Sequence, residues 1–159
     1  MMKKKQRKIK VGDIFLFGNS DQGWGCGQVM LSDINQYIVI YEPIISYSKF
    51  SLEDITSFKP LIAGWTMDAR FLSGHWDILG DIDFLPDVPF PEFKVKIKNN
   101  IWVTDIYGKK LRPAERMRDK ALPNKFSMSP VAFEKAFWAH HDNMWESRFD
   151  KLLLEPALS

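Results

Sequence analysis

Residues 9–41 read IKVGDIFLFGNSDQGWGCGQVMLSDINQYIVIY and contain the clearest strand signals of the chain. Within them, residues 9–17, 24–31 and 37–41 are rich in β-branched and aromatic side chains, which favour strands. The run at 18–23 is a dense cluster of turn-forming residues between the first two strands. Three consecutive strands with short connections predict an antiparallel meander.

The rest of the chain adds more strands to this meander. The same preferences predict strands at 61–67, 76–82, 93–98 and 101–107, the last two joined as a hairpin. Residues 84–91 contain three prolines, which exclude a central strand, so an irregular surface segment is expected there.

Helices are expected mainly at the C-terminus. Ser129-Pro130 is a strong helix start, for a helix that reaches about residue 140, and a short amphipathic turn follows it. Ser51 is the cap of a short helix, and residues 113–122 have weak helical spacing. The expected fold class is α+β: a curved antiparallel β-sheet, SH3-like or a partly open barrel in its N-terminal half, packed with C-terminal helices.

Length and composition indicate one domain in a reducing compartment. The 159 residues are expected to form a basic disordered arm at 1–8 and a single domain at 9–159. The only cysteine, Cys26, cannot form an internal disulfide. The lysine-rich start lacks the apolar stretch of a secretory signal, and no run approaches the roughly 18 apolar residues of a membrane span. A cytoplasmic protein without a membrane partner is expected.

The sequence contains no recognisable catalytic or metal-binding motif. Gly23, Gly25 and Gly27 precede a strand rather than a helix, which argues against a phosphate-binding loop. The acids around His75 do not have the spacing of a calcium loop. Cys26 lies inside an apolar strand, where a thiol is usually an inert packing residue. We therefore expect no enzyme, no metal, no cofactor and no small-molecule ligand.

Charge is strongly segregated along the chain. Residues 3–10 carry a net charge of +6, residues 11–93 carry −9 and residues 94–125 carry +7, although the whole chain is at +2. Such fields select binding partners and speed their encounter.

The acidic segment is the most informative of the three. Its last part interleaves carboxylates with aromatic rings, a combination suited to docking a basic protein surface, with rings as anchors and acids steering the approach. A second interpretation remains open, in which Trp76 and Phe84 belong to the core and the acids only solvate their strand. The predicted partner-binding residues are Trp76, Asp77, Asp81, Asp83, Phe84, Asp87 and Glu92.

Two alternatives to protein binding remain. The basic segments 3–10 and 94–125 could hold phosphates, with Trp102 and Tyr107 stacking on bases, although the segment at −9 would oppose a nucleic acid. The other alternative is an endoribonuclease on a small β-barrel. Against it, the sequence shows no set of residues that would act as general base and electrophile.

Several motifs together resemble one known family. They are the KVGDIF run at 10–15, the GCGQV run at 25–29, the SGHWDILG run at 73–80, Ser129-Pro130 and Trp145. In this order and spacing they resemble bacterial immunity proteins of polymorphic toxin systems, the group catalogued as immunity protein family twenty-six. The lysine-rich start departs from that pattern.

The resemblance implies an intracellular protein without catalytic activity. Such a protein binds the active domain of a cognate toxin and so protects the cell that produces it. The motif residues are expected to preserve the fold rather than to contact the toxin; they are Gly12, Asp13, Gly25, Gly27 and Gly80.

Overall fold

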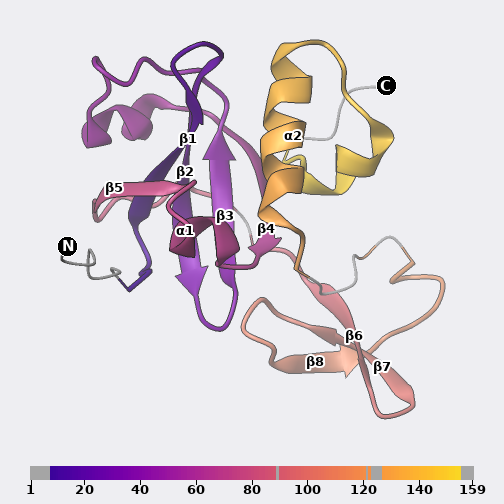
Figure 1. Cartoon of the computed structure of the whole chain (residues 1–159). Helices are drawn as coiled ribbons and strands as arrows, with labels where there is room; N and C mark the ends of the chain where they lie inside the picture. The colour runs from indigo at the N-terminus through magenta and orange to yellow at the C-terminus, as the bar shows by residue number, and fades with distance from the viewer. Residues whose placement is uncertain (1–7, 89, 121, 123–126, 155–159) are drawn as a thin grey trace. The chain divides into compact units, whose positions relative to one another are not determined.

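The computed structural model describes residues 8–88, 90–120, 122 and 127–154 (Figure 1). Contacts group them into two compact units, a finer division than the predicted single domain over 9–159. The first unit takes the described residues up to Pro86 and from Ser127 onward, and the second takes those from Asp87 to Phe126. The predicted disordered arm at 1–8 lies, apart from Lys8, outside the described residues.

The first unit is built on a five-stranded antiparallel sheet, in the order β4-β3-β2-β1-β5. The predicted meander is present as its middle strands, and β4 and β5 are the two edges, so the sheet is open. Its strands are β1 (Asp13–Asn19), β2 (Gly23–Ser32), β3 (Gln36–Tyr41), β4 (Pro60–Thr66) and β5 (Asp77–Asp81).

The strand β1 begins at Asp13 rather than at the predicted residue 9, because a tight turn precedes it. The Asp13 carboxylate accepts a hydrogen bond from the backbone N–H of Lys10 at 2.9 Å. Gly12 has φ +93°, and a Cβ there would lie 2.9 Å from the carbonyl oxygen of Ile82. The backbone conformation and the close approach both require glycine at this position.

Four helical segments complete the first unit. The helix α2 starts at the predicted Ser129-Pro130 signal, and the short helix after Ser51 has its expected capping contact, Ser51 N–H to the Asp54 carboxylate at 2.9 Å. A one-turn helix between β4 and β5 was not predicted. The helical segments are η1 (Leu52–Ser57), α1 (Ala69–Leu72), α2 (Pro130–His141) and η2 (Ser147–Leu152).

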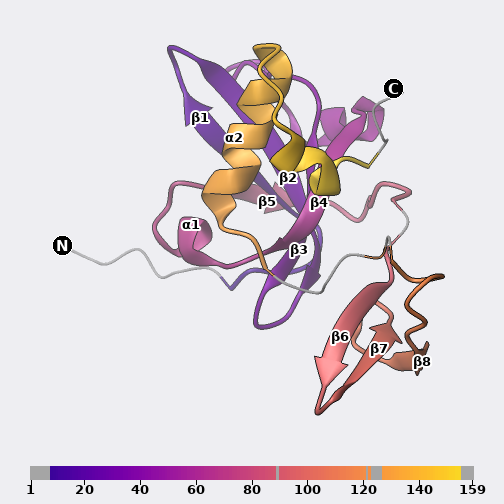
Figure 2. The ribbon, with the colours of Figure 1, turned by 90° about the vertical axis from the view of Figure 1, so that its right-hand side faces the viewer.

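Aromatic rings form the core between the sheet and α2, which lies across one face of the sheet (Figure 2). Phe15 stacks on Trp76 with ring centroids 4.7 Å apart, and Phe17 meets Phe137 edge to face at 5.1 Å. Phe15 and Phe17 also pack over β2, where a Cβ at Gly27 or Gly25 would collide with them. The alternating glycines therefore make room for rings rather than for a phosphate.

The second unit is a three-stranded antiparallel sheet in the order β6-β7-β8. Its strands are β6 (Phe93–Ile97), β7 (Asn100–Thr104) and β8 (Lys110–Pro113). The predicted hairpin is present as β6 and β7, whereas β8 was not predicted. Residues 116–120 form turns rather than the helix that their spacing weakly suggested. With two open antiparallel sheets and few helices, the chain is an α+β protein.

Candidate functional site

The predicted partner-binding residues do not form one group. Asp77 and Asp81 lie at the two ends of the edge strand β5, and Asp83 and Phe84 follow it in the first unit. All four are exposed. Asp87 and Glu92 are also exposed but belong to the second unit. We call the group in the first unit, Asp77, Asp81, Asp83 and Phe84, the acidic edge.

Trp76 is a core residue, which corrects the prediction that it anchors a partner at the surface. Its side chain is 1% exposed and lies against Phe15 and Phe71. The indole N–H donates a hydrogen bond to the Glu134 carboxylate on α2 at 2.8 Å. Residue 76 therefore ties the sheet to the helix and cannot touch a partner.

The acidic edge lies along an unpaired side of the sheet. On its inner side β5 pairs with β1, and on its outer side no strand is present in the part of the chain that the structure describes. Phe84 is 39% exposed and Leu85 is 41% exposed, so apolar surface borders the carboxylates. Asp81 forms a surface ion pair with Lys10 at 3.4 Å.

A buried side chain holds the Phe84 end of the acidic edge. Gln28 on β2 has no exposed surface, and its amide N–H₂ donates to the carbonyl oxygens of Phe84 at 2.7 Å and Gly12 at 3.3 Å. Its amide oxygen accepts from the Tyr41 hydroxyl at 2.7 Å. Burial raises the pKa of Tyr41, so this hydroxyl stays protonated and can donate. Sequence reasoning missed Gln28, although a lone amide within an apolar strand was the available signal.

Replacing Gln28 with leucine is expected to loosen the acidic edge. The change leaves the Phe84 carbonyl and the buried Tyr41 hydroxyl without this partner, a loss of about 1–3 kcal/mol in the free energy of unfolding. The same change should also accelerate hydrogen exchange at the backbone amides of residues 82–85. Gln22, exposed in the β1–β2 turn, provides the control: Q22L should change neither quantity. Unchanged exchange in Q28L would contradict this role.

The same unit also has a groove of about 780 Å³. Its walls come from the β1–β2 turn, α1, α2 and the segment after α2. Charged groups of both signs line it, among them Arg70, Glu134, Lys135 and Arg148, together with His75 and with Trp138 as an apolar wall. Arg70 and Glu134 are 3.5 Å apart. Residues 70–77 run from this groove to the start of β5, so the two features are joined by one stretch of chain.

One contact in the groove wall resembles a nucleophile and its base. The Ser73 hydroxyl lies 2.6 Å from His75 Nδ1. That hydroxyl also lies 3.3 Å from the carbonyl oxygen of Arg70, to which it can donate. In the described part of the chain no third group is recorded that would orient the imidazole, as an activated serine requires. These contacts therefore stabilise the turn between α1 and β5, and they do not make up a catalytic pair.

The other reactive groups are buried or dispersed. Cys26 is fully buried, and burial raises its pKa to about 12, so at neutral pH it is a thiol rather than a nucleophilic thiolate. Among the described residues no three His, Cys, Asp or Glu side chains are placed to hold a metal ion. None of the helices described is long and apolar enough to cross a membrane.

Comparison with known proteins adds no relative to these observations. No protein-family model matches the chain, and no match was found among curated proteins or solved structures.

Proposed function

We propose that this protein is an immunity protein, which binds a cognate bacterial toxin in the cytoplasm and neutralises it by covering its active site. The observation that carries the proposal is the acidic edge. Three exposed carboxylates and a partly exposed phenylalanine lie on or just after the edge strand β5, and Gln28 holds the backbone of Phe84 by a hydrogen bond. A surface held in place before binding loses little entropy when a partner docks.

Each part of this surface has a role in the proposed complex. Asp77, Asp81 and Asp83 attract a basic partner over long range, and Phe84 with Leu85 supplies apolar contact area. The outer side of β5 can also pair with an extended segment of the partner. A toxin that cleaves nucleic acid must be basic where it holds its substrate, so the carboxylates would stand in for phosphates there.

The finer fold belongs to the same proposal. In the first unit, consecutive strands form a meander and the last strand returns to pair with the first, giving the order β4-β3-β2-β1-β5. This connectivity supports an SH3-like, curved sheet, one that leaves β5 at an edge where a partner can reach it.

The proposal is tested by protection of a bacterial host from the toxin. The toxin is the C-terminal domain of the large secreted protein whose gene we expect next to that of this chain. Growth arrested by that domain should be restored when this protein is co-produced. Arrest by an unrelated toxin should persist, which controls for a general effect on growth. Continued arrest by the neighbouring toxin, with the protein present and folded, would refute the proposal.

A further inference from the structure

The two edges of the five-stranded sheet differ in how they are covered. At one end of β4, the backbone N–H of Met128 donates to the carbonyl oxygen of Trp65 at 2.9 Å. Toward the other end, the backbone N–H of Leu154 donates to the carbonyl oxygen of Leu61 at 3.1 Å. For residues 78–80 of β5, the described part of the chain provides no backbone hydrogen bonds except those to β1. Natural sheets usually cover such an edge, because its unpaired N–H and C=O groups can bind another strand.

Both ends of β5 are held in place within the free protein. Trp76 directly precedes the strand and is buried against Phe15. Beyond the strand, the Gln28 side chain donates to the carbonyl oxygen of Phe84 at 2.7 Å. Pairing with β1 keeps the residues between them extended. The strand β5 therefore loses little conformational entropy when another strand pairs with its outer side.

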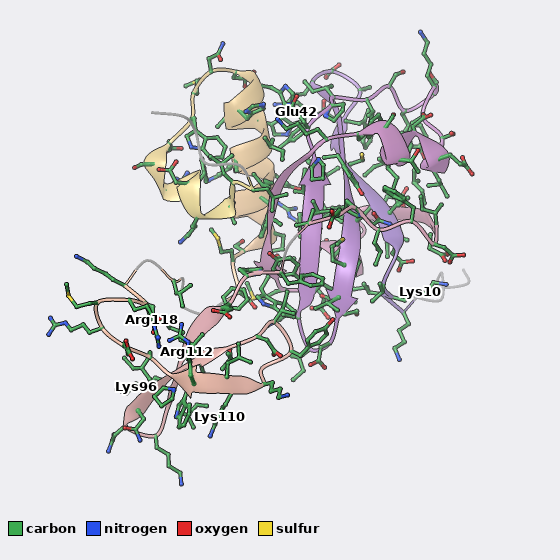
Figure 3. All side chains as sticks on the ribbon, turned by 180° about the vertical axis from the view of Figure 1, so that it is seen from behind. Lys10, Glu42, Lys96, Lys110, Arg112 and Arg118 are labelled. Atoms are coloured by element: carbon green, nitrogen blue, oxygen red, sulfur yellow. The ribbon has the colours of Figure 1, made fainter. Side chains whose placement is uncertain are left out.

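Carboxylates exclude a second copy of this chain from this edge. Asp77 and Asp83 are exposed and form no ion pair with any other described residue. Two β5 strands side by side would bring the acids of one copy against those of the other, and like charges across a ladder are destabilising. Asp81 already attracts a cation, because the Lys10 ammonium, labelled in Figure 3, lies 3.4 Å from its carboxylate. A basic strand therefore fits at this edge, whereas an identical acidic strand does not.

The register with β1 specifies the side chains that an added strand needs. Asp77 lies opposite Leu16, and the next residue, Ile78, lies opposite Phe15, so the two neighbours point to opposite faces of the sheet. Ile78 is half-buried and packs against the core on the face that α2 covers. A residue beside Ile78 should therefore be apolar, and its neighbour beside Asp77 should be Lys or Arg. A helix or a loop could meet the carboxylates, but it would leave the outward N–H and C=O groups of β5 unpaired.

We propose that the toxin is held by strand addition, in which an extended basic segment of the toxin pairs with the outer side of β5 and places a Lys or Arg beside Asp77. This inference rests on the proposed function, because the toxin is the partner. It makes a separate claim, since an immunity protein can also hold its toxin through side chains alone, without backbone pairing.

Amide hydrogen exchange distinguishes these two modes of binding. Backbone N–H groups alternate in direction along a strand, so some of those in β5 point to β1 and the others point outward. In the free protein, the outward amides should exchange fast. Strand addition should slow their exchange by at least about 100-fold, because each gains a hydrogen bond. Docking through side chains gives them no such bond.

The test follows exchange by NMR in the isotope-labelled full chain, free and bound to an inactivated form of the toxin domain used in the protection assay. The control is β6, which is also an edge strand but carries Lys94 and Lys96, so its outward amides should stay fast. In the reciprocal experiment with labelled toxin, the slowed amides should lie in one extended segment. That segment should have an apolar residue next to a Lys or Arg.

Three results would overturn the inference. In the first, the toxin binds but the outward amides of β5 stay fast, so strand addition fails while the proposed function stands. In the second, the amides of β6 are slowed as much as those of β5, which shows that the carboxylates do not select the partner. In the third, the outward amides of β5 are already slow in the free protein, which shows that the edge is occupied without the toxin. A toxin that does not bind at all refutes the proposed function and this inference with it.

Discussion

Replacing Trp76 with alanine will lower the free energy of unfolding by about 3–5 kcal/mol. The indole is 1% exposed and stacks on Phe15, so its removal leaves a large cavity between the sheet and α2. It also deprives Glu134 of a hydrogen bond from the indole. Urea unfolding followed by far-ultraviolet circular dichroism measures the change.

Two further variants separate the effect of the cavity on stability from the effect of the lost hydrogen bond. Trp76→Phe refills most of the space without the N–H, so it should recover most of the stability lost in Trp76→Ala. Trp102→Ala truncates the same residue type at a half-buried site of the second unit and should cost much less. If Trp76→Ala were no more destabilising than Trp102→Ala, Trp76 would not be a main contributor to the stability of the core.

Reversing the charge of Asp77 and Asp83 together is expected to slow association with the toxin by about 10- to 100-fold. Both carboxylates are exposed on the acidic edge, and neither is the partner of Lys10, so the change removes attraction without breaking that ion pair. The free energy of unfolding should stay within about 0.5 kcal/mol of wild type. Stopped-flow kinetics at low and high salt measure the effect, and the difference from wild type should shrink as salt rises.

The matched control reverses Asp21 and Asp33, which are exposed in the two turns of the meander. D21K/D33K alters the net charge by the same amount as D77K/D83K. If both double variants slowed association equally, net charge would be responsible rather than the acidic edge. An unchanged rate in D77K/D83K would show that the toxin binds elsewhere.

Local signals in the sequence were sufficient for the main elements of the fold. Alternating apolar residues and turn clusters located the meander, the β6–β7 hairpin and the start of α2, because these depend on neighbouring residues. The helix α1 spans only four residues, too few for a periodic pattern. The strand β8 has two charged residues, a proline and no β-branched side chain among its four residues, so its pairing with β7 could not be predicted from local composition.

The site depended on contacts between distant residues, and there the sequence was less informative. Trp76 is surrounded by exposed residues in the chain, yet its neighbours in the core come from β1 and α2, about 60 positions away on either side. Charge counts grouped Asp87 and Glu92 with the other acids, but the contacts place them in the second unit. The hydrogen bond from Gln28 to Phe84 crosses 56 positions and leaves no local pattern.

Inhibition by occlusion can be measured by titrating the purified toxin domain with this protein while the toxin's activity is followed. We expect the activity to fall linearly and reach zero at one molar equivalent, with full activity and unchanged toxin mass once the complex is dissociated. Inhibition by much less than one equivalent, or a permanent change in the toxin, would contradict it by showing that the protein acts as an enzyme. So would undiminished activity at an excess of the protein.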